Sequence, residues 1–190
     1  MSDHRSLEVY TDHAVGYRTG DTGKFEELAM PHFAKLFNFA CWLTQDRTAA
    51  EELVQETYMK ALKGFPSFRQ GTNFRAWIYR ILRNTFLTSR AGLKAALSLD
   101  DEDGPEEPST SETPESVLIA HRERESIETA LEELPVRFRE IILLCDLEEM
   151  SYEEISQTLG IPAGTVMSRL SRARKAMRAL LAAGMQGARR

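Results

Sequence analysis

The sequence has few cysteines and no long apolar run. Its two cysteines, Cys41 and Cys145, lie far apart inside apolar helical patterns, which argues against a disulfide framework, a Cys-x-x-Cys pair or a zinc site. Both are interpreted as buried thiols rather than redox sensors. No stretch approaches the roughly 18 to 20 apolar residues of a membrane span, and the polar N-terminus lacks the core of a secretory signal. We therefore expect a cytoplasmic protein without membrane insertion.

The sequence also lacks a recognisable catalytic constellation. The four histidines are scattered along the chain: His4, His13, His32 and His121. No serine, cysteine or lysine has an identifiable base partner, and there is no Walker-type glycine loop. These absences predict a protein that is not an enzyme and that needs neither a metal nor a cofactor.

Acidic residues are missing from two stretches of a chain whose formal net charge is -5. The first stretch lies between Glu56 and Asp100, and the second follows Glu154. Basic residues occupy both: Lys60, Lys63, Arg69, Arg75, Arg80, Arg83, Arg90 and Lys94 in the first, and Arg169, Arg172, Arg174, Lys175, Arg178, Arg189 and Arg190 in the second. Attraction to phosphate depends on the local field within about 8 to 10 Å. Two nucleic-acid-facing surfaces are therefore compatible with an acidic protein, although solvated helix faces would explain either stretch alone.

Apolar residues recur at helical spacing from about residue 24 to residue 90, and no strand pattern or internal repeat is present. We expect three helices there. The segment "TQDRTAAEE" marks one helix start, with Asp46 or Thr48 as the cap. The segment "GFPSFRQGTN" breaks the pattern with Gly64, Pro66 and Gly71, which predicts an ordered loop of about ten residues.

The middle of the chain mixes acids with proline, serine and threonine and offers little to bury. The segment "LSLDDEDGPEEPSTSETPE" is typical of a flexible linker. Helical periodicity resumes from residue 117. The fold class that follows is all-α, with two small helical domains joined by a flexible acidic linker. We expect an N-terminal extension over residues 1–23, a first domain over 24–92, the linker over 93–116, a second domain over 117–183 and a tail over 184–190.

The segment "SYEEISQTLGIPAGTVMSRLSRARKAM" predicts a helix-turn-helix. Ser151 and Glu154 form a capping box, and Gly160 and Pro162 end one helix and open the next. Tyr152, Ile155 and Leu159 are expected on the apolar face of the first helix, and Val166, Leu170, Ala173 and Met177 on that of the second. An outer face of Thr165, Ser168, Arg169, Arg172 and Lys175 suits the major groove of DNA, because arginine bonds guanine edges. The alternative is an arginine-rich surface helix in a bundle.

The segment from Arg47 to Arg90 combines aromatic and basic residues. Proteins hold unstacked bases in this way, since rings or a pocket receive the base while lysine and arginine follow the backbone. Core packing is the competing interpretation for each ring, and Trp77 is assigned to the core.

At this point the sequence resembles the extracytoplasmic-function (group IV) sigma-70 factors of bacterial RNA polymerase. "EELVQETYMKA" is similar to their region 2.2 helix, "FPSFRQGTNFRAWIYRILRN" to regions 2.3 and 2.4, and "LPVRFREIILLCDLEEMSYEEISQTLGIPAGTVMSRLSRARKAM" to region 4. The likeness covers about residues 24–90 and 117–182. The resemblance implies that segments corresponding to sigma domains 1.1 and 3 are absent, as in this family.

The resemblance implies a function and its residues. The protein would bind core polymerase, read the minus-35 element with its second domain and melt the minus-10 element with its first. A set on one helix matches the surface that docks on the beta-prime clamp helices: Glu51, Glu52, Gln55 and Glu56. The minus-10 set is Phe68, Arg69, Gln70, Gly71, Thr72, Asn73, Arg80, Arg83 and Asn84, the loop members capturing a flipped base. The minus-35 set is Thr165, Met167, Ser168, Arg169, Ser171, Arg172 and Lys175.

The implied partners are core RNA polymerase, through the beta-prime clamp helices and the beta flap, promoter DNA, and an anti-sigma factor. The acidic linker resembles the connector that runs through the RNA exit path of polymerase. Two rival functions stay open from the sequence: a stand-alone helix-turn-helix regulator that binds duplex DNA as a dimer, and a nucleic-acid-processing enzyme.

Overall fold

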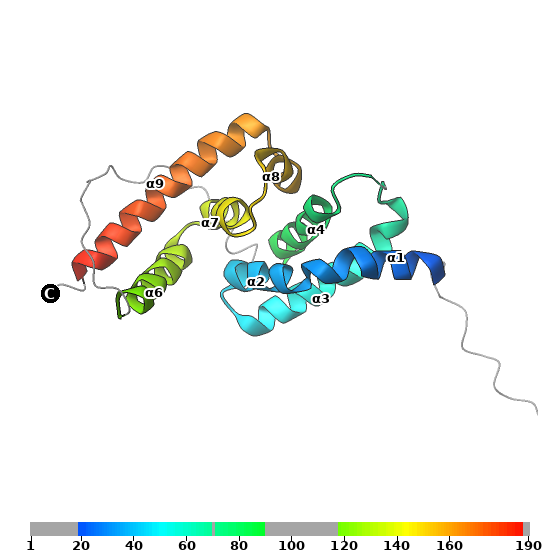
Figure 1. Cartoon of the computed structure of the whole chain (residues 1–190), viewed down its shortest axis with the longest axis horizontal. Coiled ribbons are helices and arrows are strands. Elements are labelled where there is room, and N and C mark those ends of the chain that lie inside the picture. The colour runs from blue at the N-terminus through cyan, green and yellow to red at the C-terminus, as the bar shows by residue number, and fades with distance from the viewer. Residues whose placement is uncertain (1–18, 70, 90–117, 188–190) are drawn as a thin grey trace, which may run out of the picture.

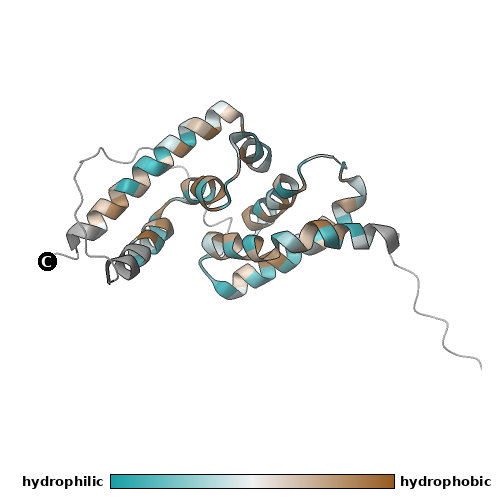
Figure 2. Ribbon diagram, viewed as in Figure 1, coloured by the Kyte–Doolittle hydropathy of each residue, from teal (hydrophilic) through white to brown (hydrophobic). Residues whose placement is uncertain are grey.

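A computed structural model describes residues 19–69, 71–89 and 118–187, and all regular structure in those ranges is helical (Figure 1). The predicted linker over 93–116, most of the N-terminal extension and part of the C-terminal tail lie outside the described residues. One helical group contains α1 to α4 and the other contains α6 to α9. Figure 2 shows hydrophobic residues concentrated on α2, α4 and α7, where the two groups face each other.

The first group contains four α-helices, whereas the sequence predicted three. They are α1 (Thr19–Ala29), α2 (Phe33–Thr44), α3 (Arg47–Gly64) and α4 (Phe74–Thr88). The apolar periodicity runs unbroken from Phe25 to Leu43, but the 3-10 turn η1 (Met30–His32) separates α1 from α2. Pro31 lacks an N–H group and starts a new turn, so it divides the run in two.

Local signals set the start of α3 and α4. Asp46 is the N-cap of α3 and accepts a hydrogen bond from the N–H of Ala49 at 2.7 Å, which confirms one of the two expected caps. Asn73 caps α4 in the same way, because its side-chain oxygen accepts from the N–H of Ala76 at 3.0 Å. The loop between these helices contains the 3-10 turn η2 (Phe65–Ser67).

The second group contains α6 (Leu118–Glu133), α7 (Val136–Ile142), α8 (Tyr152–Leu159) and α9 (Ala163–Gly187). A π-helical turn, η4 (Leu143–Leu147), extends α7. In Figure 1 the long helix α9 runs beside α6 and meets α8 at its start.

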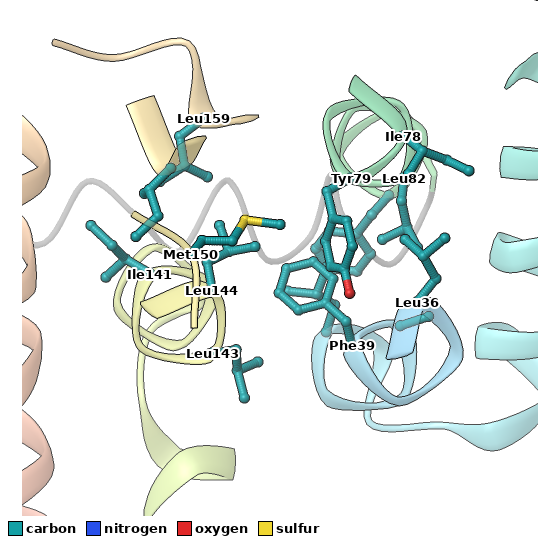
Figure 3. Close-up of a cluster of buried hydrophobic side chains, with 14 of the residues drawn as sticks. Leu36, Phe39, Ile78, Tyr79, Leu82, Ile141, Leu143, Leu144, Met150 and Leu159 are labelled. Atoms are coloured by element: carbon teal, nitrogen blue, oxygen red, sulfur yellow. The ribbon is translucent and has the colours of Figure 1, made fainter. Parts of the chain in front are cut away.

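Buried side chains from both groups form one continuous core. Tyr79 and Phe39 of the first group are fully buried and lie 5.3 Å apart, ring centre to ring centre. Met150, which is 3% exposed, lies between these rings and the leucines of the second group (Figure 3). Burial raises the pKa of the Tyr79 hydroxyl above its ordinary value. The sequence predicted two separate domains and did not anticipate that they would pack on each other.

Arg139 on α7 is a buried cation that holds this junction together. Only 4% of it is exposed, and its guanidinium donates to the backbone carbonyls of Leu131, Glu132 and Leu134 at 2.7, 2.6 and 3.0 Å. These carbonyls belong to the end of α6, where helix carbonyls lack helical partners. A fourth bond at 2.9 Å reaches the carbonyl of Trp42 at the end of α2, in the other helical group.

Candidate nucleic-acid interface

The loop between α3 and α4 is a closed turn that exposes polar groups. Thr72 donates its hydroxyl to the carbonyl of Arg69 at 2.7 Å, and its N–H donates to the same oxygen at 3.1 Å. Gly71 has a φ of 89°, a left-handed conformation that favours glycine. Arg69, Gly71 and Thr72 are exposed, while Gln70, which belongs to the same predicted set, lies outside the described residues.

The ring of Phe68 packs between this loop and the aromatic residues of the core. It stacks on Phe65 with the ring centres 6.0 Å apart, and it lies 5.4 Å from Phe74 and 4.9 Å from Trp77. Phe68 and Trp77 are both half-buried against the core, in keeping with the assignment of Trp77 to it. The ring of Phe68 therefore anchors the loop, and the groups left accessible beside it are those of Arg69 and Thr72.

The remaining minus-10 residues divide into two classes. Arg80 and Asn84 are exposed on α4. Asn73 and Arg83 are half-buried and bind acids of the second helical group: the side-chain amide of Asn73 donates to Glu154 at 2.8 Å, and Arg83 forms two bonds to Glu140 at 2.7 and 3.2 Å. The described members of the predicted set therefore lie in the loop before α4 and along α4, and two of them, Asn73 and Arg83, are bound to acids of the second helical group.

The helix-turn-helix follows the expected local geometry. The Ser151 hydroxyl accepts from the N–H of Glu154 at 3.2 Å, and the Glu154 carboxylate accepts from the N–H of Ser151 at 2.8 Å, which confirms the capping box. These bonds to Ser151 are the main cause that lowers the pKa of Glu154, and the amide of Asn73 adds to it. Ile155 and Leu159 are buried as predicted, but Tyr152 is 42% exposed. The prediction for Tyr152 was wrong, because the first residue of α8 projects beyond the core.

Gly160 ends α8 with a φ of 67°, and its N–H donates to the carbonyl of Ser156 at 2.8 Å. We expect Gly160→Ala to destabilise the protein by about 1 kcal/mol, since a side chain in this left-handed conformation is strained although no neighbouring atom would clash with it. Chemical denaturation monitored by helicity would measure this. Gly164→Ala is the matched control: the site is helical, equally open and without positive φ, so it should be neutral or slightly stabilising. Equal stability of both variants would contradict the turn geometry.

The helix α9 presents the predicted outer face. Val166, Leu170 and Ala173 are buried and Met177 is half-buried against the core, which confirms the inner stripe. Outward residues are Met167, Ser168, Ser171 and Arg172, all exposed, with Thr165, Arg169 and Lys175 half-buried. Met167 is 57% exposed. Arg169 also belongs to the predicted DNA-binding face, but its guanidinium lies 3.7 Å from the buried Glu140 carboxylate.

A third surface lies on α3. The predicted polymerase-binding residues Glu51, Glu52, Gln55 and Glu56 are all exposed on that helix. Beside them runs an apolar groove lined by Met30, Phe33, Phe37, Val54, Tyr58 and Met59. Met30, Phe33 and Met59 are 59%, 46% and 54% exposed. This groove was not predicted from the sequence, because helical spacing alone does not show which of these apolar residues lie in the core and which remain exposed.

The described residues offer no sign of metal chemistry or of a disulfide. Within these parts of the chain, no three histidine, cysteine or carboxylate side chains lie close enough together to hold a metal ion. Cys41 and Cys145 are free and half-buried rather than buried as expected, and burial raises the pKa of both thiols. No helix among the described residues is long and apolar enough to cross a membrane.

Comparison with known proteins identifies both helical groups. The family "Sigma-70 region 2" matches residues 28–95, and the family "Sigma-70, region 4" matches residues 124–177. The chain is 35% identical to the ECF RNA polymerase sigma factor SigE of Mycolicibacterium smegmatis, over 90% of this chain and 68% of that protein. It is 36% identical to the ECF RNA polymerase sigma factor EcfG of Rhodopseudomonas palustris, over 75% and 77% respectively.

A solved structure shows the same fold. It is that of the sigma factor RpoE in complex with the anti-sigma factor NepR from Bartonella quintana, with a TM-score of 0.63 and 30% identity, covering 83% of this chain and 96% of that one.

Proposed function

The chain belongs to the ECF family of sigma-70 RNA polymerase sigma factors, and on this basis we propose which of its surfaces bind promoter DNA and which bind core polymerase. As a member of this family it directs RNA polymerase to initiate transcription at specific promoters, and it catalyses no reaction itself. Its two sigma regions are the helical groups described above. One observation supports the assignment of a DNA-binding surface to each helical group: each group has its own exposed basic face.

The second group reads the minus-35 element with α9. Its exposed Ser168, Ser171 and Arg172 project from the first turns of a helix that follows a tight turn, which is the geometry of major-groove recognition. Met167 offers apolar contact to a thymine methyl group. Lys175, further along α9, is placed to contact phosphate.

The first group opens and traps the minus-10 element. The turn at Arg69, Gly71 and Thr72 offers a guanidinium, an accessible backbone and a hydroxyl at the edge of an aromatic cluster. Arg80 and Asn84 extend this surface along α4 and follow the displaced strand. An unstacked base needs polar groups of this kind for its edge and an apolar surface for its face.

We expect Thr72→Ala combined with Arg69→Ala to slow promoter opening while leaving duplex binding intact, because the two side chains are exposed and support no core contact. Abortive transcription on duplex and pre-melted templates would measure this. The pre-melted template should restore most of the activity. Pro66→Ala, a change at an exposed loop residue outside the proposed set, is the control. Equal losses on both templates would remove the loop from strand opening.

The exposed face of α3 and the apolar groove beside it bind the beta-prime clamp helices of core polymerase, while the second group contacts the beta flap. Acidic rims next to an apolar centre resemble the composition of specific protein interfaces. The cellular site of action that follows is the bacterial cytoplasm, where core polymerase is found. A stand-alone regulator would leave this surface and the region 2 match without a role.

The double variant Glu52→Lys/Glu56→Lys should bind core polymerase at least about 10-fold more weakly, since reversing two rim charges replaces attraction with repulsion. Both residues are exposed, so the helical content should stay unchanged. Fluorescence titration with purified core polymerase would give the Kd. Glu26→Lys/Glu27→Lys on α1 is the matched control with the same change in net charge. Equal affinity of the two double variants would contradict the assigned docking face.

We also propose an anti-sigma factor as a partner, because the related RpoE structure contains one, NepR. Copurification of the chain from its own cells, followed by identification of bound proteins, tests this proposal. Recovery of polymerase alone would count against it.

A further inference from the structure

One phenylalanine of α1 contacts aromatic rings from three other elements. Phe25 is 5% exposed, and its ring centre lies 6.2 Å from that of Tyr58 on α3, 5.4 Å from that of Phe65 in η2 and 6.3 Å from that of Phe74 on α4. The interplanar angles are 78°, 71° and 69°, so all three contacts are edge-to-face, an arrangement that aromatic pairs prefer. Phe25 therefore connects α1 to the residues at both ends of the loop between α3 and α4.

The rings at the two ends of this loop also hold Phe68, a member of the minus-10 set. Phe65 stacks on Phe68 with an interplanar angle of 12°, and Phe74 meets Phe68 edge-to-face at 88°. The N–H of Phe68 donates to the carbonyl of Phe65 at 2.9 Å. Phe65 and Phe74 are themselves buried, at 6% and 8% exposed. Phe68 is thus held by two buried rings that both pack on Phe25.

The position of Phe25 is fixed by the attachment of α1 to α3 (Figure 1). The hydroxyl of Tyr58 donates to the carbonyl of Ala29, the last residue of α1, at 2.8 Å. Ala29 is fully buried, and Phe25 lies four residues before it on the same face of the helix. The match to sigma-70 region 2 begins at residue 28, so it does not include Phe25.

We infer that Phe25 is a positioning residue for the minus-10 element: through the rings around Phe68 it holds the turn that follows in the geometry that receives an unstacked base. The inference rests on the proposed function, because it uses the assignment of this loop to base capture. The turn is closed by two bonds from Thr72 to the carbonyl of Arg69, the residue directly after Phe68. A displaced Phe68 ring therefore displaces the turn as well.

Phe25→Leu tests this role, and Phe86→Leu is the matched control. Leucine leaves space beside Phe65 and Phe74, and their rings can move into it. Phe86 is also buried, at 2% exposed, but it lies near the far end of α4 from the loop. Both variants lose the same ring atoms from the same helical group, so both should lose stability.

Each chain is assayed with core polymerase on a single-stranded oligonucleotide that contains the minus-10 element found by promoter-library transcription. A second series of oligonucleotides has an abasic site at each position of that element in turn. The measured quantity is the ratio of the Kd for the abasic oligonucleotide to the Kd for the intact one at the captured position. Misfolded protein lowers the active fraction for both oligonucleotides alike, so the ratio separates positioning from stability.

For the unmodified chain and for Phe86→Leu the ratio should be about 10, in the range expected for one stacked base. For Phe25→Leu it should fall to about 2, because a displaced turn gains little from the presence of the base. If Phe25→Leu does not fold, Phe25→Met, whose flexible side chain fills more of the space, is read by the same ratio.

Failure of the inference is separable from failure of the proposed function. A ratio for Phe25→Leu equal to that for Phe86→Leu would overturn the positioning role and leave the function of the loop intact. Equal affinity of the unmodified chain for abasic and intact oligonucleotides at every position would reject the loop as the base-capturing element, and the positioning role with it.

Discussion

Arg139→Met should destabilise the protein by about 3 kcal/mol or more, because methionine leaves buried carbonyls without a donor. The guanidinium donates to four carbonyl oxygens, three at the end of α6 and the fourth on Trp42. The Glu132 oxygen has a second donor in the Gln45 side-chain amide at 2.9 Å, so the substitution affects mainly the other three. Methionine fills a similar volume, so the loss reflects hydrogen bonding rather than a cavity. Thermal unfolding followed by circular dichroism should show a Tm lower by on the order of 10 °C.

Arg174→Met is the matched control for this substitution. Arg174 forms an ion pair with Asp146 at 2.5 Å, but both side chains are 45% exposed, and exposed ion pairs contribute about 1 kcal/mol or less. The two variants remove the same charge from the same helical group. A Tm for Arg139→Met within 2 °C of the control would contradict the role of Arg139 as the link between α6, α7 and α2.

Arg172→Ala should weaken promoter binding by about 1 to 3 kcal/mol, which is roughly 5- to 150-fold in Kd. Arg172 is exposed on α9 and its Nε lies 3.4 Å from the carbonyl of Ser168 one turn earlier, so its removal should leave the fold intact. Holoenzyme binding to promoters with single base changes across the minus-35 element would measure the loss. If Arg172 reads a base, the loss disappears at promoters that lack that base.

Two outcomes would change or exclude the assignment of Arg172 to a base of the minus-35 element. A loss that is equal at all sequences, with a salt dependence reduced by about 1 in slope, would assign Arg172 to a phosphate. No loss relative to Arg174→Ala, which removes a charge from another face of α9, would exclude Arg172 from the interface. The comparison is informative because both arginines lie on one helix, two residues apart.

Local signals in the sequence were sufficient to predict the helix-turn-helix and the start of α3. The capping box, the left-handed Gly160 and the Asp46 cap depend on neighbouring residues, so their patterns are visible without a fold. The division between α1 and α2 was missed, because apolar spacing continues through Pro31 and outweighed a single proline. Tyr152 was placed on the wrong side of α8 because periodicity fixes a face poorly at a helix end.

The contacts between the two helical groups could not be predicted from one sequence. Arg83 and Glu140 carry opposite charges, but nothing local indicates that they meet across 57 positions. Arg83 and Arg169 were predicted as DNA-binding residues and Arg75 only as a member of a basic stretch, whereas the structure pairs each with a buried acid. Glu140, Glu148 and Arg139 were not singled out at all, because charged residues in a helical pattern are normally exposed.

This chain should select promoters only together with core polymerase. The most direct measurement is transcription of a promoter library by purified chain and bacterial core polymerase, with start sites read by sequencing. The start sites should share a minus-35 and a minus-10 motif, and they should vanish when either component is omitted. Start sites identical to those of core polymerase alone would contradict this prediction.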